Sequence, residues 1–284
     1  MCGRYVASRP VSELADLLDA REIEPAPPLR ALDDGSVPPA RWNVAPQAAV
    51  WAMTHKRPDA ESEASPASGE PVRRLAQYQW GLVPSWAKEP SVGARMFNAR
   101  AEGIETKPAF RAAIQKRRCI IPADAFYEWA PAPAATPGVR GKPRKQPWCF
   151  RPTDGTVIAF AGLYEAWKPK APATDGTEPG WLMTCTIITT EANELMSPIH
   201  NRMPVILTPD NWDLWLARTP LDEDVIGSLL VPAGPDVLVA YRVSDLVSNS
   251  RNEGPELEEP LHESAGPVDG QSFDRDDFPL LADL

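Results

Sequence analysis

Cys2 has the most distinctive chemistry in the chain, because it becomes the first residue once Met1 is removed. A small second residue permits that removal by an aminopeptidase, and Cys2 then carries a free α-amine beside its thiol. The reference pKa of an α-amine is about 7.7–8.0, so an appreciable fraction is neutral at physiological pH and can form an imine with an aldehyde. The thiol can then close onto the same carbon as a five-membered thiazolidine, and this closure is effectively unimolecular. Gly3 permits close backbone approach beside this candidate nucleophile.

Two other interpretations of Cys2 stay open on this residue alone. The first is a cysteine that stands at position 2 by chance in a frayed terminus of a non-catalytic DNA- or peptide-binding module. The second rests on the Met-Cys-Gly-Arg start, which is also similar to that of the N-terminal-cysteine glutamine amidotransferases, whose thiol attacks a carboxamide. The sequence has no Asn-Gly-rich oxyanion segment of the kind expected in that class, and no synthetase domain follows.

The remaining cysteines and the histidines do not form a metal motif. Cys119, Cys149 and Cys185 lie in apolar stretches and are expected to be small buried residues. No two cysteines have a CxxC or other zinc-like spacing. His55 is expected in a loop and His262 lies near the acidic tail. We therefore expect no metal and no organic cofactor.

Five further segments combine polar side chains with aromatic residues or proline, as binding and catalytic sites do. They are Arg41–Pro46 (RWNVAP), Trp80–Trp86 (WGLVPSW), Phe97–Glu102 (FNARAE), Ala123–Trp129 (ADAFYEW) and Ser197–Pro204 (SPIHNRMP). With the MCGRY start, their order and spacing resemble the SOS response-associated peptidase (SRAP) family, the abasic-site processing proteins. The resemblance runs from residue 2 to about Leu261. Each motif is short, but six in order are specific.

The resemblance implies a single SRAP domain that binds single-stranded DNA and crosslinks covalently to abasic sites. The crosslink would be a thiazolidine at Cys2 that shields the lesion, because the ring-opened abasic sugar presents the aldehyde that an aminothiol requires. The protein would then be an enzyme with lyase-like and peptidase character, and the peptidase activity would be autoproteolytic exposure of Cys2. The alternative is an N-terminal-cysteine amidase or peptidase that acts on non-DNA substrates.

Three residues of the motifs are expected to join Cys2 in catalysis. Glu128 follows two aromatic residues, and burial there would raise its pKa toward the range useful for opening the sugar ring and stabilising the imine. His200 would shuttle protons, and the Asn98 amide would hold a sugar hydroxyl or the aldehyde oxygen. A structural histidine and a turn asparagine are the alternatives. Ala125 stands where the family often has glycine, which bears on the position of the Glu128 carboxylate.

A second group of residues is expected to contact DNA. Its members are Arg4, Asn43, Pro46, Trp86, Arg100, Trp129 and Arg202. The arginine forks match phosphate oxygens, the tryptophans stack on bases or wedge the strand, and the asparagine and proline line the groove. Core packing is the alternative for the tryptophans, because the chain has ten of them.

The charge distribution permits a nucleic-acid partner in spite of a net charge of −10. Residues 253–284 hold ten acids and one base, a net charge of −9, so residues 1–252 hold 29 acids and 28 bases. The main body is therefore almost neutral and can carry a basic face. Seven cations fall within 24 residues: Arg95, Arg100, Lys107, Arg111, Lys116, Arg117 and Arg118.

Strand patterns dominate the elements that must position these residues. Stretches rich in Val, Ile, Thr and aromatic residues predict strands over 48–54, 73–81, 119–122, 148–151, 156–167, 181–190 and 237–242. Helices are expected at 10–19, 210–216 and 222–230. The sum is an α+β fold, a single domain with a mostly antiparallel, barrel-like β core and a few peripheral helices.

The predicted domain spans residues 1–261, with flexible loops or insertions at 55–72 and 130–146. A further loop is expected at 168–180. Residues 253–284 are acidic, and 262–284 are expected to be a disordered tail. The sequence has no signal peptide and no apolar run of about 20 residues, so we expect no membrane association and a cytoplasmic location, at the nucleoid in a bacterium. A monomer is expected.

Overall fold

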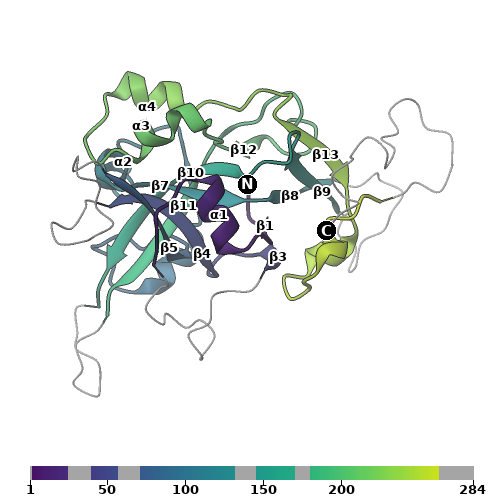
Figure 1. Cartoon of the computed structure of the whole chain (residues 1–284), viewed down its shortest axis with the longest axis horizontal. Helices are drawn as coiled ribbons and strands as arrows, with labels where there is room; N and C mark the ends of the chain where they lie inside the picture. The colour runs from purple at the N-terminus through teal and green to yellow at the C-terminus, as the bar shows by residue number, and fades with distance from the viewer. Residues whose placement is uncertain (1, 25–39, 57–70, 132–144, 170–179, 262–284) are drawn as a thin grey trace, which may run out of the picture.

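The protein is described here from a computed structural model of residues 2–24, 40–56, 71–131, 145–169 and 180–261 (Figure 1). Its strands are β1 Tyr5–Ala7, β2 Glu22–Glu24, β3 Arg41–Val44, β4 Ala49–Lys56, β5 Val72–Trp80, β6 Asn98–Arg100, β7 Arg118–Ala123, β8 Ala125–Pro131, β9 Lys145–Pro152, β10 Ile158–Trp167, β11 Leu182–Glu191, β12 Arg202–Pro204 and β13 Leu238–Arg242. Its α-helices are α1 Val11–Leu17, α2 Arg111–Lys116, α3 Trp212–Leu216 and α4 Glu223–Leu229, and its 3-10 helices are η1 Pro90–Arg95, η3 Pro209–Asn211, η4 Asp245–Ser248 and η5 Pro255–Leu257.

Five strands close into a barrel. The larger sheet has the order β12-β11-β10-β7-β4-β5-β2, and an additional pairing joins β11 to β5. That pairing is parallel, with Cys185 opposite Trp80, whereas the other four contacts of the barrel are antiparallel. The expected α+β fold with a mostly antiparallel, barrel-like core is confirmed.

A second sheet has the order β13-β9-β8-β1-β3 and is antiparallel throughout. One of its faces, with Tyr5 and Phe126, shares a buried apolar cluster with barrel residues such as Phe160. The chain passes from the barrel strand β7 to β8 of the second sheet at a single residue, Asp124. Asp124 therefore marks the corner where the two sheets meet.

The outer face of the barrel is covered by the helices. Alternate residues of the barrel strands, such as Met53, Leu75 and Ile120, share a second buried cluster with residues of all four helices. Figure 1 shows α2, α3 and α4 gathered at one end of the barrel sheet and α1 lying across β4. This alternation gives each barrel strand one face toward the interior and one toward the helices.

The C-terminal residues of the described chain pack on the other face of the second sheet. Val247 and Leu257 are buried there against Tyr127 of β8, and the side chain of Glu253 forms a 2.7 Å ion pair with Arg41 of β3. Leu257 therefore anchors the acidic residues 253–261 to the second sheet. Residues 262–284 lie outside the described part of the chain.

The expected strands and the three expected helices are present with shifted ends. The expected loop at 55–72 begins later than predicted, because His55 lies inside β4, is buried, and contacts Asp213 at 3.2 Å. It also ends earlier than predicted, because Val72 begins β5. Residues 57–70 of that loop, and most of the loops at 130–146 and 168–180, lie outside the described residues. The boundary of the domain at 261 stays a prediction. In the described chain, no helix is long and apolar enough to span a bilayer.

Candidate active site

The strand that follows Cys2, β1, is fixed at its far end by Asp124. The Asp124 carboxylate accepts hydrogen bonds from the backbone N–H of Ser8 at 2.6 Å and of Arg9 at 3.2 Å. It also forms a 2.8 Å ion pair with the Arg9 guanidinium, and its side chain is 5% exposed. A charged group that is buried in this way is tolerated because charged and backbone donors satisfy it. The end of β1 is thus held at the corner between the sheets.

The other end of the strand is held by Asn98 of β6. The Asn98 side-chain Nδ2 donates a 2.7 Å hydrogen bond to the backbone carbonyl of Cys2. Its Oδ1 is buried and has no hydrogen-bond partner within the described part of the protein. A buried amide oxygen of this kind is costly unless something donates to it. Asn98 therefore positions Cys2 and keeps one acceptor for a further donor.

Asn98 is placed by the two motifs before it. The Trp80 indole N–H donates to the Phe97 carbonyl at 2.8 Å, and Gly81, with φ of 137°, passes against Gly93 of η1. A Cβ at position 81 would lie 2.5 Å from the Gly93 carbonyl oxygen, so only glycine fits there. The FNARAE motif is thus led to the parallel edge of β11, where Asn98 pairs with Ile187.

Glu128 lies on β8, the strand that pairs with β1. The Tyr127 N–H donates to the Arg4 carbonyl at 3.0 Å, which sets Glu128 beside the first residues of the chain. The side chain of Glu128 is buried (4% exposed). Burial, and then the negative charge of Glu128, raise the pKa of the Cys2 thiol far above its ordinary value, while the Arg4 backbone N–H opposes this. The thiol is therefore neutral at physiological pH.

Ala125 imposes no backbone strain on this arrangement. It is an extended residue of β8 that pairs with Val6. Asp19 and Gln47 are the only non-glycine residues of the described chain with positive φ. Alanine in the place of the family's glycine is accommodated here without a left-handed conformation.

A pocket of about 440 Å³ opens next to Asn98. It is lined by Arg100, Glu102, Glu191, His200, Asn201 and Arg202. Side chains alternate along a strand, and Ala99 is buried under the helices, so Asn98 and Arg100 point to the same side of β6. The pocket and the Asn98–Cys2 contact are therefore about two residues, roughly 7 Å, apart along β6.

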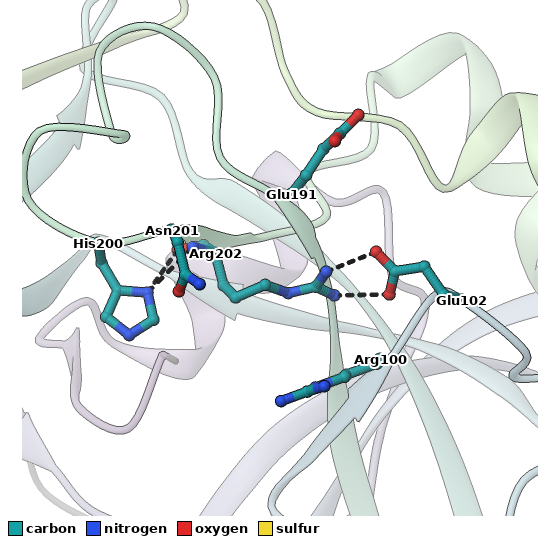
Figure 2. A pocket seen from close by; sticks show the side chains of 6 residues that line it. All are labelled: Arg100, Glu102, Glu191, His200, Asn201 and Arg202. Atoms are coloured by element: carbon teal, nitrogen blue, oxygen red, sulfur yellow. Dashed lines mark hydrogen bonds and ion pairs between the residues drawn. The ribbon is translucent and has the colours of Figure 1, made fainter.

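Inside the pocket, Arg202 is paired with Glu102 (Figure 2). Its guanidinium holds both carboxylate oxygens, at 2.5 and 2.9 Å, and also donates to the Thr189 carbonyl. The hydrogen bond to Arg202 lowers the pKa of Glu102. Arg100 is exposed and lies beside this pair in Figure 2. The pocket thus offers one exposed cation and one cation that an acid already neutralises.

His200 faces the same pocket with a defined ring orientation. The backbone N–H of Arg202 lies 3.0 Å from Nδ1 of His200. An amide N–H can only donate, so this contact uses Nδ1 as an acceptor. The Arg202 carbonyl oxygen lies 3.3 Å from the same Nδ1 and can only accept, so that contact requires the other tautomer. The Arg202 backbone thus holds the Nδ1 edge of the ring at the pocket.

Arg4 and Asn43 belong to a separate network at the C-terminal segment. Arg4 donates to Asn43 Oδ1 at 2.6 Å and to the Val247 carbonyl at 2.8 Å, and its guanidinium lies 5.6 Å from the Trp129 ring centroid. Asn43 is fully buried and donates to the Val247, Asn249 and Asn252 carbonyls. These contacts hold the C-terminal segment on the second sheet. The expected DNA contacts of Arg4 and Asn43 stay predictions.

The remaining residues of the expected DNA group differ in exposure. Trp86 is 57% exposed, in the turn after β5. Trp129 is half-buried, and its indole N–H donates to the Ser248 hydroxyl at 3.0 Å. Pro46 is half-buried in the turn before β4. Of the two tryptophans in this group, Trp86 is therefore the one whose ring is largely exposed to solvent.

Comparison with known proteins assigns the family. The profile of the SOS response associated peptidase (SRAP) family matches residues 1–250. The chain belongs to the SRAP family. It is 39% identical to the abasic site processing protein YoqW of Bacillus subtilis over 257 residues, which are 90% of this chain and 98% of that protein. It is 30% identical to the abasic site processing protein HMCES of Gallus gallus, with 92% of this chain and 78% of that protein covered.

Solved structures share the fold of this SRAP protein. A protein from Bacteroides thetaiotaomicron superposes with a TM-score of 0.70 at 24% identity, over 92% of this chain and all of the other. A protein from Bordetella bronchiseptica superposes with a TM-score of 0.59 at 25% identity over 86% of this chain.

Nine of the eleven expected site residues of the SRAP protein fall into three places, and Pro46 and Trp86 lie outside them. Cys2, Asn98 and Glu128 meet at the first strand, whereas His200 joins Arg100 and Arg202 at the pocket. Arg4, Asn43 and Trp129 lie at the C-terminal segment.

Two residues with clear roles carried no expectation. Asp124, in ADAFYEW, anchors the first strand, and Glu102, in FNARAE, occupies Arg202. Both lie inside motifs in which other residues were predicted to form the site. Their position within these motifs is the feature of the sequence that could have indicated a role. In the described residues, no group of three or more His, Cys, Asp or Glu side chains is arranged to hold a metal.

The coupling between Glu128 and Cys2 predicts a change in thiol reactivity. Glu128→Gln removes the negative charge that raises the pKa of the thiol, so the thiolate fraction at a given pH should increase. We expect alkylation of Cys2 by iodoacetamide at pH 8 to become about 3- to 10-fold faster, measured by mass spectrometry of the N-terminal peptide. Glu259→Gln, at an exposed acid, is the matched control, and equal rates in both variants would contradict the coupling.

Proposed function

We propose that this protein processes abasic sites in single-stranded DNA by forming a covalent thiazolidine crosslink through Cys2. The observation that carries the proposal is the placement of Cys2. Asn98 donates a hydrogen bond to the carbonyl of Cys2, and the negative charge of Glu128 raises the pKa of its thiol. A pocket lined by Arg100 and Arg202 opens along the same face of β6. The names of the relatives, abasic site processing proteins, agree with this assignment.

The proposed reaction has two bond-forming steps at one carbon. Removal of Met1 exposes the α-amine of Cys2, and self-catalysed removal is the peptidase activity we assign to the protein. The neutral amine adds to C1′ of the ring-opened abasic sugar, and the carbinolamine loses water to give an imine. The Cys2 sulfur then adds to the imine carbon, and its proton passes to the nitrogen. The net change joins aminothiol and aldehyde as a thiazolidine with release of one water.

The state of the thiol supports this order of steps. Because burial and Glu128 keep the thiol protonated, the amine, which has a reference pKa of about 7.7–8.0, is the better first nucleophile near neutral pH. The thiol needs to lose its proton only when the imine is in place. Glu128, a buried carboxylate at this point, is suited to take that proton.

Asn98 and His200 complete the proposed catalytic group. The Oδ1 of Asn98 is a buried acceptor, which suits the hydroxyl that the sugar gains when its ring opens. His200, whose imidazole lines the pocket, would deliver a proton to the leaving water or to the ring oxygen. Because His200 lies on the pocket and not on Cys2, it would act from the DNA side of the sugar.

Arg100 and Arg202 would bind the phosphates beside the lesion. Guanidinium forks match phosphate oxygens, and both lie within about two to four strand residues of Asn98 through the β6–β11–β12 pairing. Arg202 must first exchange Glu102 for a phosphate. Because the Glu102 side chain is exposed, solvent screens its ion pair with Arg202, and a phosphate can replace the carboxylate. Arg4, Trp86, Trp129, Asn43 and Pro46 complete the proposed DNA contacts.

The first test is intact-protein mass spectrometry with a single-stranded oligonucleotide that carries one abasic site. We expect loss of Met1 and one oligonucleotide-sized mass increase that survives without a reductant. Cys2→Ala keeps the α-amine but lacks the thiol, so it should give an adduct only when borohydride reduces the imine. An oligonucleotide without the abasic site should give no adduct with either protein.

Three outcomes of this test would reject the proposal. A folded protein with Cys2 at its N-terminus that forms no adduct would favour the amidase or peptidase alternative. A stable adduct with Cys2→Ala and no reductant would show that another residue is the nucleophile. An adduct of equal yield on the intact oligonucleotide would show that the abasic aldehyde is not the target.

The ion pair in the pocket predicts an effect of Glu102 on affinity. Glu102→Gln frees the Arg202 guanidinium, so we expect tighter binding of single-stranded DNA and a slope of log K against log salt that is steeper by about one contact. Fluorescence anisotropy over a salt series measures both. Glu191→Gln is the matched control, because it removes one charge from the same pocket but leaves the Arg202–Glu102 pair intact. Equal effects of the two variants would contradict a specific role of the pair.

A further inference from the structure

Two tryptophans of the ten present large exposed surfaces, and they lie at one end of the barrel. Trp86 is 57% and Trp181 is 58% exposed, whereas the other eight are buried or half-buried. Trp86 directly precedes Ala87, and Trp181 directly precedes Leu182. Ala87 and Leu182 pack with Trp167 in one small buried cluster. The Trp167 indole donates to the Ala87 carbonyl at 2.8 Å and ties the two segments together. The two exposed rings thus flank one rigid cluster.

This aromatic end connects to the candidate active site along β11. The strand begins at Leu182. The carbonyl of Cys185 accepts a hydrogen bond from the Gly81 N–H, and Ile187 pairs with Asn98. Five strand residues, roughly 17 Å, therefore separate Leu182 of this cluster from the Asn98–Cys2 contact, and Trp181 lies one residue further away. That span suits a few nucleotides of an extended single strand.

Cations accompany the aromatic rings along this route. The ammonium of Lys168 lies 6.0 Å from the Trp181 ring centroid. Lys88 and Arg95 are exposed in the segment between Trp86 and β6, and Arg100 is exposed at the pocket. Glu89 is the one acid among the exposed charged residues from 84 to 100. Residues 84–100 therefore carry a net positive charge, in a protein whose overall charge is −10.

We propose that Trp181, with Lys168, is a second base-stacking platform that extends the single-stranded DNA site beyond Trp86. The inference rests on the proposed function and assigns a residue outside the six motifs. Exposed aromatic rings interleaved with cations are what sequence-tolerant binding of single strands requires. A protein partner would bury an apolar patch instead, but the residues beside these rings, Lys88 and Lys168, are cations that favour a polyanion.

Oligonucleotide length separates this platform from the crosslinking site. We compare wild-type protein and Trp181→Ala on abasic-site oligonucleotides of about 5 and about 15 nucleotides, within the range of single-strand site sizes. Anisotropy gives the affinity and mass spectrometry the adduct yield. We expect Trp181→Ala to weaken binding of the long strand about 5- to 100-fold, with unchanged adduct formation on the short strand. Trp181→Phe should retain most of the affinity.

Leu214→Ala is the matched control, because Leu214 is an exposed apolar residue (42%) of α3, a helix that packs against β7. Its affinity should equal that of wild type. Unchanged long-strand affinity in Trp181→Ala would overturn the proposal and favour a protein partner for this face. Equal loss on both lengths would also overturn it, since Trp181 would then act in the site itself. Failure of wild-type protein on the short strand would instead reject the proposed function.

Discussion

The hydrogen bonds of Asp124 are the constraint on which the rest of the site depends. This one carboxylate stands where the chain leaves the barrel for the second sheet, and it accepts the backbone N–H groups of Ser8 and Arg9. It therefore fixes the end of β1 relative to β8, which begins at the next residue. Cys2 precedes β1, and Glu128 lies further along β8, the strand that pairs with β1. The position of the proposed nucleophile relative to its proposed proton acceptor therefore depends on this corner residue.

The two sheets make different contributions to the chemistry. The second sheet supplies Cys2 and Glu128, and its buried position accounts for the neutral thiol, because burial disfavours the thiolate more than any neighbouring charge favours it. The larger sheet supplies Asn98, Arg100 and Arg202 from β6 and β12, which lie outside the barrel and pair with its strand β11. The proposed catalytic and phosphate-binding groups therefore converge from separate sheets onto the N-terminus.

The sequence predicted long elements better than the short ones that carry the site. The apolar and β-branched runs of β10 and β11 are long enough to identify a barrel, but β1, β6 and β12 have three residues each, too few for a period to be seen. Cys2, Asn98 and Glu128 were named from aminothiol chemistry and motif resemblance. The role of Asp124 depends on which backbone amides come within 3.2 Å of its carboxylate, and that depends on tertiary packing. The pairing of Glu102 with Arg202 likewise joins segments 100 residues apart.

The most direct test of this account is the effect of Asp124→Ala on Cys2 in protein shown by circular dichroism to remain folded. Released from its anchor, the first strand should misplace the nucleophile, and a displacement of about 1 Å can cost about 100-fold in rate. We predict that crosslinking to an abasic-site oligonucleotide slows by about 10- to 100-fold and that iodoacetamide alkylates Cys2 faster, with Asp210→Ala as the exposed control. A folded Asp124→Ala protein with the wild-type crosslinking rate and a protected Cys2 would contradict the central claim.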